Sequence, residues 1–144
     1  MLKKDFTSTP ATYPVCIHSD CPLAATCLHQ MAYVEKVKTD EHLRLINPTL
    51  CAKDASCKYH RDCTPVRYAR GFTNFQKRMY PDQYSDFMAI CVAHWPRNQY
   101  FERRRGDRPL SPNEQQFILK TLKQVGVTED FEFDSYEPII NWYD

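Results

Sequence analysis

The chain has 144 residues and a formal net charge of +1, and 13% of its residues are aromatic, which suits one domain with a core of its own. Its three glycines, Gly71, Gly106 and Gly126, are widely separated. This excludes a glycine-rich phosphate loop and a dinucleotide-binding fingerprint, because both need closely spaced glycines. Since the net charge is nearly neutral, any affinity for nucleic acid or membranes must come from local patches.

The start of the chain bears on the cellular compartment. Lys3 and Lys4 are followed by no apolar run, so the sequence does not indicate a secretory signal, and no stretch approaches the length of a membrane span. We therefore expect a cytoplasmic protein with reduced thiols, in which clustered cysteines favour metal binding over disulfides. A secreted form whose signal has been removed is the alternative.

The N-terminal segment is expected to lead into a helix. Residues 1–15 are polar and suggest an extended arm. Cys21-Pro22 then predicts a helix that starts with Cys21 as the N-cap and continues to about Lys38, because proline is favoured at the first helical position. Its apolar stripe consists of Leu23, Cys27, Met31 and Val34. Cys27 is therefore either a metal ligand or a small core residue.

The next segment is poor in core-forming residues. Residues 40–50 are expected to form a short strand or a turn of helix around residues 43–46, whereas residues 51–65 contain almost no aliphatic side chains. Such a segment stays loose unless something else organises it. Metal coordination is the natural organiser, because the free energy of metal binding becomes folding free energy. The alternative is a surface loop whose cysteines are incidental.

A second helix is expected to begin at Tyr80-Pro81 and to end at Pro96. Its run of residues 87–93 is nearly all apolar, so we expect it to be the central core helix. On this interpretation Cys91 belongs to the core and not to a metal site.

The third predicted helix has the clearest boundaries. Ser111-Pro112-Asn113-Glu114 is a capping box with proline at the first helical position, and Gly126 suits the C-terminal cap. Beyond Val127, acidic residues alternate with aromatic and aliphatic ones, without one Lys or Arg. We expect this tail to dock on the domain as a strand or a short helix.

Six of the seven cysteines form two evenly spaced triplets, which are Cys16, Cys21 and Cys27, then Cys51, Cys57 and Cys63. The second triplet has the spacing Cys51-x5-Cys57-x2-His60-x2-Cys63 and supplies three thiolates and one imidazole, a complete tetrahedral set for zinc. The first triplet offers a second site with His18 or His29. Alternatively, cysteines of both triplets share one four-thiolate site or an iron–sulfur cluster.

A structural metal site is favoured over a catalytic one. Catalytic zinc keeps an open coordination position and usually has a carboxylate base nearby, and no His-Glu-x-x-His or His-x-Glu motif occurs. No carboxylate pair or nucleophile–base combination is spaced well enough to nominate an active site. The sequence therefore favours a binding protein over an enzyme.

Two basic stretches are candidates for contact with a partner. One surrounds the second cysteine triplet. The other provides the predicted nucleic-acid or protein-binding residues, which are Tyr100, Arg103, Arg104, Arg105 and Arg108. Arginine and aromatic groups together grip phosphates and stack bases. The alternative is that these arginines are solvated or paired with the acidic tail.

Several motifs carry a family resemblance. They are Cys21-Pro22-Leu23 with Cys27, Tyr68-Ala69-Arg70-Gly71-Phe72, Tyr100-Phe101-Glu102-Arg103-Arg104-Arg105-Gly106 and Pro109-Leu110-Ser111-Pro112-Asn113-Glu114-Gln115. In their order they resemble an uncharacterised bacterial family of small cysteine-rich proteins, known only as a domain of unknown function. The likeness spans most of the chain, and it implies no activity, substrate or cofactor.

We therefore expect a mainly α, small single domain with about three main helices. A cysteine-rich, loop-dominated, metal-binding part (1–65) would pack on a helical part with an acidic-aromatic tail (66–144). The expected function is that of an intracellular, zinc-stabilised binding protein, with no membrane contact, that meets nucleic acid or a protein partner. The alternative is an iron–sulfur or thiol-based redox or sensor protein. The sequence does not indicate an oligomeric state.

Overall fold

The computed structural model describes residues 9–142, so the first eight residues of the expected N-terminal arm lie outside the described part. The described residues divide into two compact units. Residues 9–65 and 140–142 form one, here called the cysteine-rich unit, and residues 66–139 form the other, here called the α/β unit. The chain therefore leaves the cysteine-rich unit after Pro65 and returns to it after Ile139.

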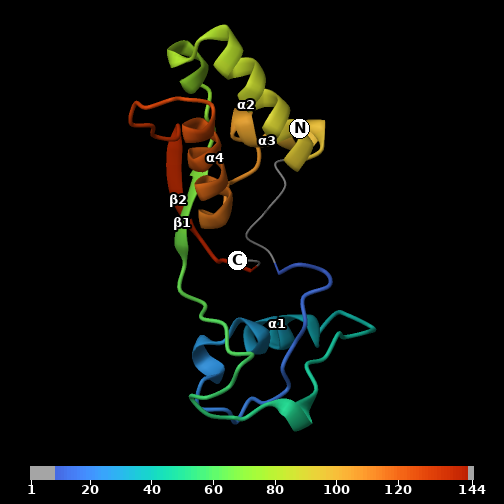
Figure 1. The fold of residues 1–144 in the computed structure, drawn as a ribbon. Helices are drawn as coiled ribbons and strands as arrows, with labels where there is room; N and C mark the ends of the chain where they lie inside the picture. Colours follow the sequence, from blue (N-terminus) through green and yellow to red (C-terminus); the bar gives the residue numbers. More distant parts are fainter. Residues whose placement is uncertain (1–8, 143–144) are drawn as a thin grey trace. The chain divides into compact units, whose positions relative to one another are not determined.

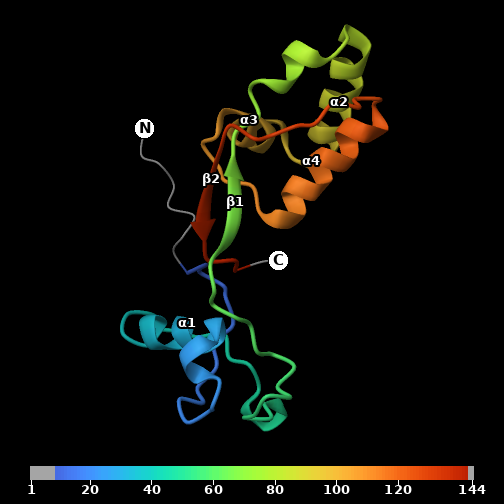
Figure 2. The same cartoon turned by 90° about the vertical axis from the view of Figure 1, so that its left-hand side faces the viewer.

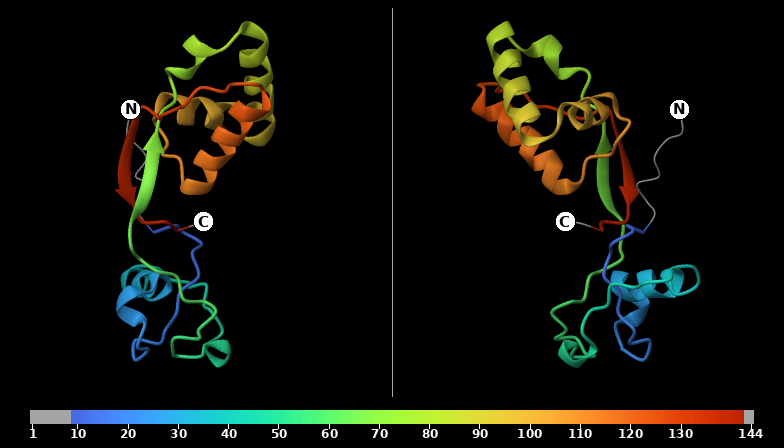
Figure 3. Two further views of the ribbon diagram at one scale, coloured as in Figure 1. Left: turned by 60° about the vertical axis from the view of Figure 1, so that its left-hand side comes forward. Right: turned by 90° about the vertical axis from the view of Figure 1, so that its right-hand side faces the viewer.

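The α/β unit combines three helices with a two-stranded sheet. Strand β1 (Val66–Arg70) pairs antiparallel with β2 (Ser135–Ile139), so that Val66 lies opposite Ile139 and Arg70 opposite Ser135. Its helices are α2 (Pro81–His94), α3 (Arg97–Arg105) and α4 (Pro112–Gln124). All three lie on one side of the strand pair (Figures 1 and 3).

The expectation of a mainly α fold with about three helices is wrong. The described chain contains four α-helices and an antiparallel strand pair, which is a mixture of α and β structure. Helix α3 escaped prediction because its sequence is mostly charged or polar and lacks an apolar period. Strand β1 escaped it because it depends on a partner far away in the sequence. Strand β2 lies in the tail, for which a strand was one of the two expected forms, although Pro138 weakens its local signal.

Helices α2 and α4 confirm the sequence-based predictions. Helix α2 begins at Pro81 and ends at His94, two residues before Pro96. Helix α4 begins at Pro112, where the Ser111 hydroxyl accepts from the Glu114 amide and the Glu114 carboxylate accepts from the Ser111 amide, both at 3.3 Å. The capping box therefore forms as predicted.

An aromatic cluster forms the core of the α/β unit. Phe72 is completely buried, and its ring lies 5.2 Å from Phe75 and 6.0 Å from Tyr100, measured between ring centroids. Cys91 is also completely buried in this cluster, which confirms its assignment to the core. Aromatic pairs at these separations add stability beyond the apolar area that they bury.

The cysteine-rich unit is mostly loop, with α1 (Leu28–Lys36) as its α-helix and two short 3₁₀ turns, Ala24–Thr26 and Pro48–Leu50 (Figure 2). The prediction that a helix starts at Pro22 is wrong. Helix α1 begins six residues later, because Cys27 is held in an extended conformation by a bridge to Asp62.

A small core holds this unit together. It consists of Tyr13, Val15, Leu28, Ala32 and Trp142. Tyr13 and Val15 belong to the segment expected to be a polar arm, and both are buried. Val15 forms a bridge with Leu45, which is all that the described structure shows of the short strand expected near residues 43–46. Trp142 packs edge-on against Tyr13 at 4.9 Å between ring centroids.

We predict that Gly71→Ala destabilises the α/β unit by about 2–4 kcal/mol. Gly71 has φ +77°, and a Cβ there would lie 2.6 Å from Oδ2 of Asp134, the atom that accepts from the Thr73 amide and hydroxyl. Left-handed strain of about 1–2 kcal/mol would therefore add to weakened hydrogen bonds of about 1 kcal/mol each. Urea unfolding followed by circular dichroism measures the change.

Gly126→Ala is the matched control for this variant. Gly126 has φ +94°, but an added Cβ would meet only the flexible end of Gln83, at 3.3 Å. This variant should therefore show the backbone strain alone, about 1–2 kcal/mol. Equal losses in the two variants would contradict the role assigned to Asp134.

Candidate metal centre

Cysteines of both triplets line one small cavity in the cysteine-rich unit. Its cysteines are Cys16, Cys21, Cys27, Cys51 and Cys57, and its histidines are His18, His29 and His60. The cavity volume is about 20 Å³, which is on the scale of one ion or water molecule and far below that of an organic cofactor site. All seven cysteines of the chain are free thiols.

Two contacts hold together the loops that carry these cysteines. Nε2 of His18 lies 3.2 Å from the carbonyl oxygen of Pro48. Nζ of Lys53 forms an ion pair with Asp20 at 3.1 Å. Because His18 and Asp20 lie between two cysteines of the first triplet, these contacts bring residues 16–21 beside residues 48–53.

Cys51 is influenced by the other thiols of the group. Burial raises its pKa, and so do Cys16, Cys57 and Cys21, in decreasing order, because a thiolate at Cys51 would be repelled by negative charge on its neighbours. A cation among these sulfurs would reverse this effect, because it would stabilise the thiolate form of each.

The histidines of the cavity have defined roles for their ring nitrogens. Nδ1 of His29 lies 2.7 Å from the carbonyl oxygen of Pro14, and since a carbonyl only accepts, Nδ1 carries the proton. Nε2 of His29 therefore keeps its lone pair. By the same argument His18 donates through Nε2 to Pro48 and keeps its lone pair on Nδ1. Such tautomer-fixing bonds are typical of histidines at metal sites.

The structure does not place all the predicted zinc ligands together. Cys51, Cys57 and His60 line the cavity, but Cys63 is not among the residues that line it. Cys63 instead packs against the small core, and its amide donates to the carbonyl of Thr26 at 2.9 Å. Cys27 is buried and lines the cavity.

The thiols must move to bind an ion. In the part of the chain that the structure describes, no group of three or more His, Cys, Asp and Glu side chains is arranged to hold a metal as it stands. Metal binding would deprotonate the thiols and draw them inward. Gln30 was not predicted, and no apolar or cysteine pattern marks it. Its buried Oε1 has no hydrogen-bond partner in the described structure, and its side chain lines the same cavity.

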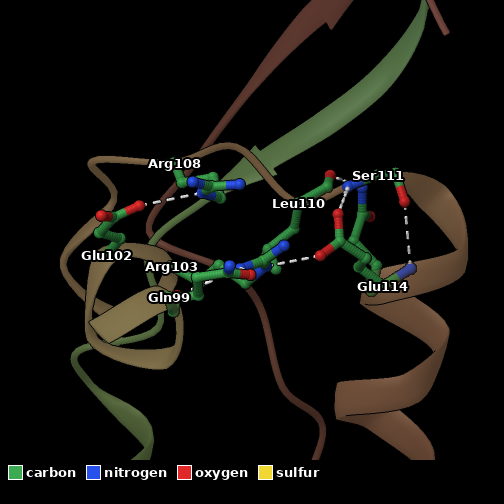
Figure 4. A network of polar contacts seen from close by, with 8 residues as sticks. Gln99, Glu102, Arg103, Arg108, Leu110, Ser111 and Glu114 are labelled. Atoms are coloured by element: carbon green, nitrogen blue, oxygen red, sulfur yellow. Dashed lines mark hydrogen bonds and ion pairs between the residues drawn. The ribbon is translucent and has the colours of Figure 1, made fainter. Parts of the chain in front are cut away.

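The predicted partner-binding arginines are engaged within the α/β unit (Figure 4). Arg103 is buried, and its Nε donates to Glu114 Oε2 at 2.5 Å. Its guanidinium carbon also lies 4.7 Å from the centroid of the Trp95 ring. Arg103 therefore links α3 to α4 and does not face solvent.

The remaining members of this group differ in exposure. Arg105 pairs with Asp107, and Arg108 pairs with Glu102, each at 3.0 Å. Arg104 donates to the Tyr84 hydroxyl at 2.7 Å. Tyr100 is completely buried, which raises the pKa of its hydroxyl to about 12. Among the five predicted residues only Arg105 is exposed.

Acidic residues of the tail pair with Arg70, which belongs to the basic stretch around the second cysteine triplet, and with Arg78. The guanidinium of Arg70 on β1 forms an ion pair with the carboxylate of Glu137 on β2. Arg78 pairs with Glu129 at 3.8 Å, but both side chains are largely exposed, so this pair adds little stability.

Comparison with known proteins gives one match. A family model described as a family of unknown function (DUF6078) matches residues 1–142, which confirms the resemblance to an uncharacterised family. No curated protein and no solved structure matches the chain. In the described residues, no helix has both the length and the apolar character needed to cross a membrane.

We predict that Arg103→Ala destabilises the α/β unit by about 2–4 kcal/mol. Removal of Arg103 breaks a buried ion pair, which typically costs about 3–5 kcal/mol, and Glu114 regains part of its hydration because its side chain is 25% exposed. Arg105→Ala is the control and should cost less than about 1 kcal/mol, since its ion pair is half exposed. Urea unfolding of both variants is the measurement, and an Arg103 loss as small as that of Arg105 would contradict the structural role.

Cys91 is expected to resist alkylation in the folded protein. Burial raises the pKa of the Cys91 thiol to about 12, and alkylation requires the thiolate. At pH 8, iodoacetamide should modify the half-buried Cys57 well before Cys91, and Cys91 should react only in denaturant. Peptide mass spectrometry of chelator-treated protein measures both sites, and equal rates in the folded state would refute the prediction.

Proposed function

We propose that this chain, which belongs to that family of unknown function, is a cytoplasmic, zinc-stabilised binding protein. The observation that carries the proposal is the convergence of cysteines from two separate loops on one small cavity. Thiolates are preferred zinc ligands, and thiolate-rich sites are usually structural. The metal would therefore stabilise a unit that presents a surface to a partner.

The composition of the cysteine-rich unit supports a structural ion. Residues 51–65 contribute no member to the buried core of this unit, apart from the partly buried Cys63. Their backbone is without α-helix or strand. Metal ligation would supply the folding free energy that apolar burial does not supply there.

The partner of this protein is proposed to be a nucleic acid or another protein. Arg105 is the exposed member of the predicted patch. Arg97 lies at the opposite end of the same short helix and is also exposed. The burial of Arg103 and Tyr100 removes two residues from that surface.

An iron–sulfur cluster or a thiol-based redox role is the alternative function. Four or more clustered cysteines also suit an iron–sulfur cluster. The cavity volume of about 20 Å³ favours a single ion. The two metals are easily distinguished, because an iron–sulfur protein is brown and a zinc protein is colourless.

We expect anaerobically purified protein to contain about one zinc ion per chain. Zinc should leave as the pH falls, because protons compete with the metal for the thiolates. Elemental analysis, an absorption spectrum and a thiol count are the measurements. Iron with sulfide would overturn the zinc assignment in favour of redox chemistry, and seven free thiols without any metal would overturn metal binding altogether.

A further inference from the structure

We infer that the two cysteine triplets share one four-thiolate zinc site formed by Cys16, Cys21, Cys51 and Cys57. This inference rests on the proposed zinc-binding function and identifies its ligands. It replaces the sequence-based set of Cys51, Cys57, His60 and Cys63. Each of the two loops would supply two thiolates, with spacings Cys16-x4-Cys21 and Cys51-x5-Cys57.

The first argument is that the two loops are already joined around these four residues. The ion pair between Lys53 and Asp20 links a position two residues after Cys51 to the position directly before Cys21. The contact of His18 with the carbonyl of Pro48 links the segment after Cys16 to the turn before Cys51. Neither contact involves the segment around Cys63.

The second argument is the proximity of the four sulfurs. Cys16 and Cys21 from one loop and Cys51 and Cys57 from the other face the same small cavity. All four side chains line the same cavity and are only partly buried. A water-sized space among four such thiols suits a tetrahedral ion, once the sulfurs draw in to about 2.3 Å from it.

The other two cysteines have different surroundings. Cys27 lines the cavity, but it is buried and its backbone is fixed by the bridge to Asp62. Cys63 packs against the small core of the cysteine-rich unit and is not among the residues that line the cavity. Both are therefore assigned to packing, which makes them suitable controls.

The histidines are assigned to support and not to ligation, because four thiolates already complete a tetrahedral zinc shell. The Nε2 proton of His18 is directed to Pro48, so this ring ties the two loops together. His60 contacts the Thr26 hydroxyl through Nε2 at 3.3 Å, and that hydroxyl donates to the carbonyl of Leu23. The hydroxyl therefore accepts from His60, which anchors the ring to the turn before α1.

Such a site has a closed coordination shell. On binding, four thiols lose their protons to solvent as four zinc–sulfur bonds form, and the site carries a net charge of −2. Four thiolates leave no coordination position for water or substrate. The ammonium of Lys53, two residues after Cys51, would offset part of the negative charge.

Cobalt titration of the metal-free, reduced protein tests the ligand set, because Co²⁺ bound to thiolates gives intense absorption that reports their number. Serine variants of the four proposed ligands, Cys16, Cys21, Cys51 and Cys57, should each weaken Co²⁺ and Zn²⁺ binding by more than about 100-fold, since loss of even an outer-shell partner costs about 10–100-fold. Cys27→Ser, Cys63→Ser and His60→Asn are the controls. Each should lose less than about tenfold, below the cost of an outer-shell partner, because none is assigned as a ligand and His60 contacts Thr26 instead of a proposed ligand.

A second measurement needs no variant, so it stands even where a substitution prevents folding. Wild-type protein is alkylated with and without zinc, and each cysteine is followed by mass spectrometry. Zinc should protect Cys16, Cys21, Cys51 and Cys57 and leave the reactivity of Cys63 unchanged. Cys91 should be unreactive in both states.

The outcomes separate this inference from the proposed function. If wild-type protein binds neither ion, the zinc-binding function fails and the ligand set fails with it. If it binds zinc but Cys63 is protected, or if Cys63→Ser or His60→Asn loses as much affinity as Cys51→Ser, the four-thiolate assignment is wrong while the zinc-binding function stands.

Discussion

The stability of the cysteine-rich unit is limited by the small amount of apolar surface that it buries. Its buried apolar core is formed by five side chains, and two of these, Tyr13 and Trp142, lie at opposite ends of the described sequence. A core of this size supplies little stability for some sixty residues, most of them in loops. The loops are instead joined by polar contacts, such as Lys53 with Asp20, around a group of thiols. Metal binding at these thiols would add the missing free energy at the point where the apolar core ends.

The α/β unit, in contrast, buries many aromatic side chains. Its polar and charged groups therefore need partners close to this aromatic core. Phe72, Phe87 and Tyr100 are completely buried, and α3 brings a run of arginines against the same core. Arg103 is accommodated by Glu114 on one side and the Trp95 ring on the other, so its charge is satisfied without solvent. The sequence suggests that these arginines form a partner-binding patch, but Arg103 instead joins helix α3 to helix α4. Of the five residues predicted to meet a partner, Arg105 alone is exposed.

The sequence predicted those elements whose signals are local. The capping box at Ser111 and the proline at Pro81 place α4 and α2, and the apolar run of α2 places Cys91 in the core. It did not predict β1 or its pairing with β2, since that pairing joins residues about seventy positions apart, nor α3, whose burial is carried by Tyr100 and Arg103 without an apolar period. At the candidate site the residue types were recognisable from spacing, but their grouping was not. Evenly spaced cysteines look equivalent in the sequence, whereas the bridge of Cys27 to Asp62 and the packing of Cys63 set these two apart.

The return of the chain to the cysteine-rich unit has a consequence for protein synthesis. Trp142 is 5% exposed in the core of that unit, yet the ribosome makes it after every residue of the α/β unit. Synthesis of the cysteine-rich unit therefore begins first and is completed last. The α/β unit is free to fold in the interval between these two steps. During this interval the cysteines of the nascent chain have no finished core beside them. Early capture of a metal ion would protect these thiols from oxidation and mispairing while the ribosome completes the rest of the chain.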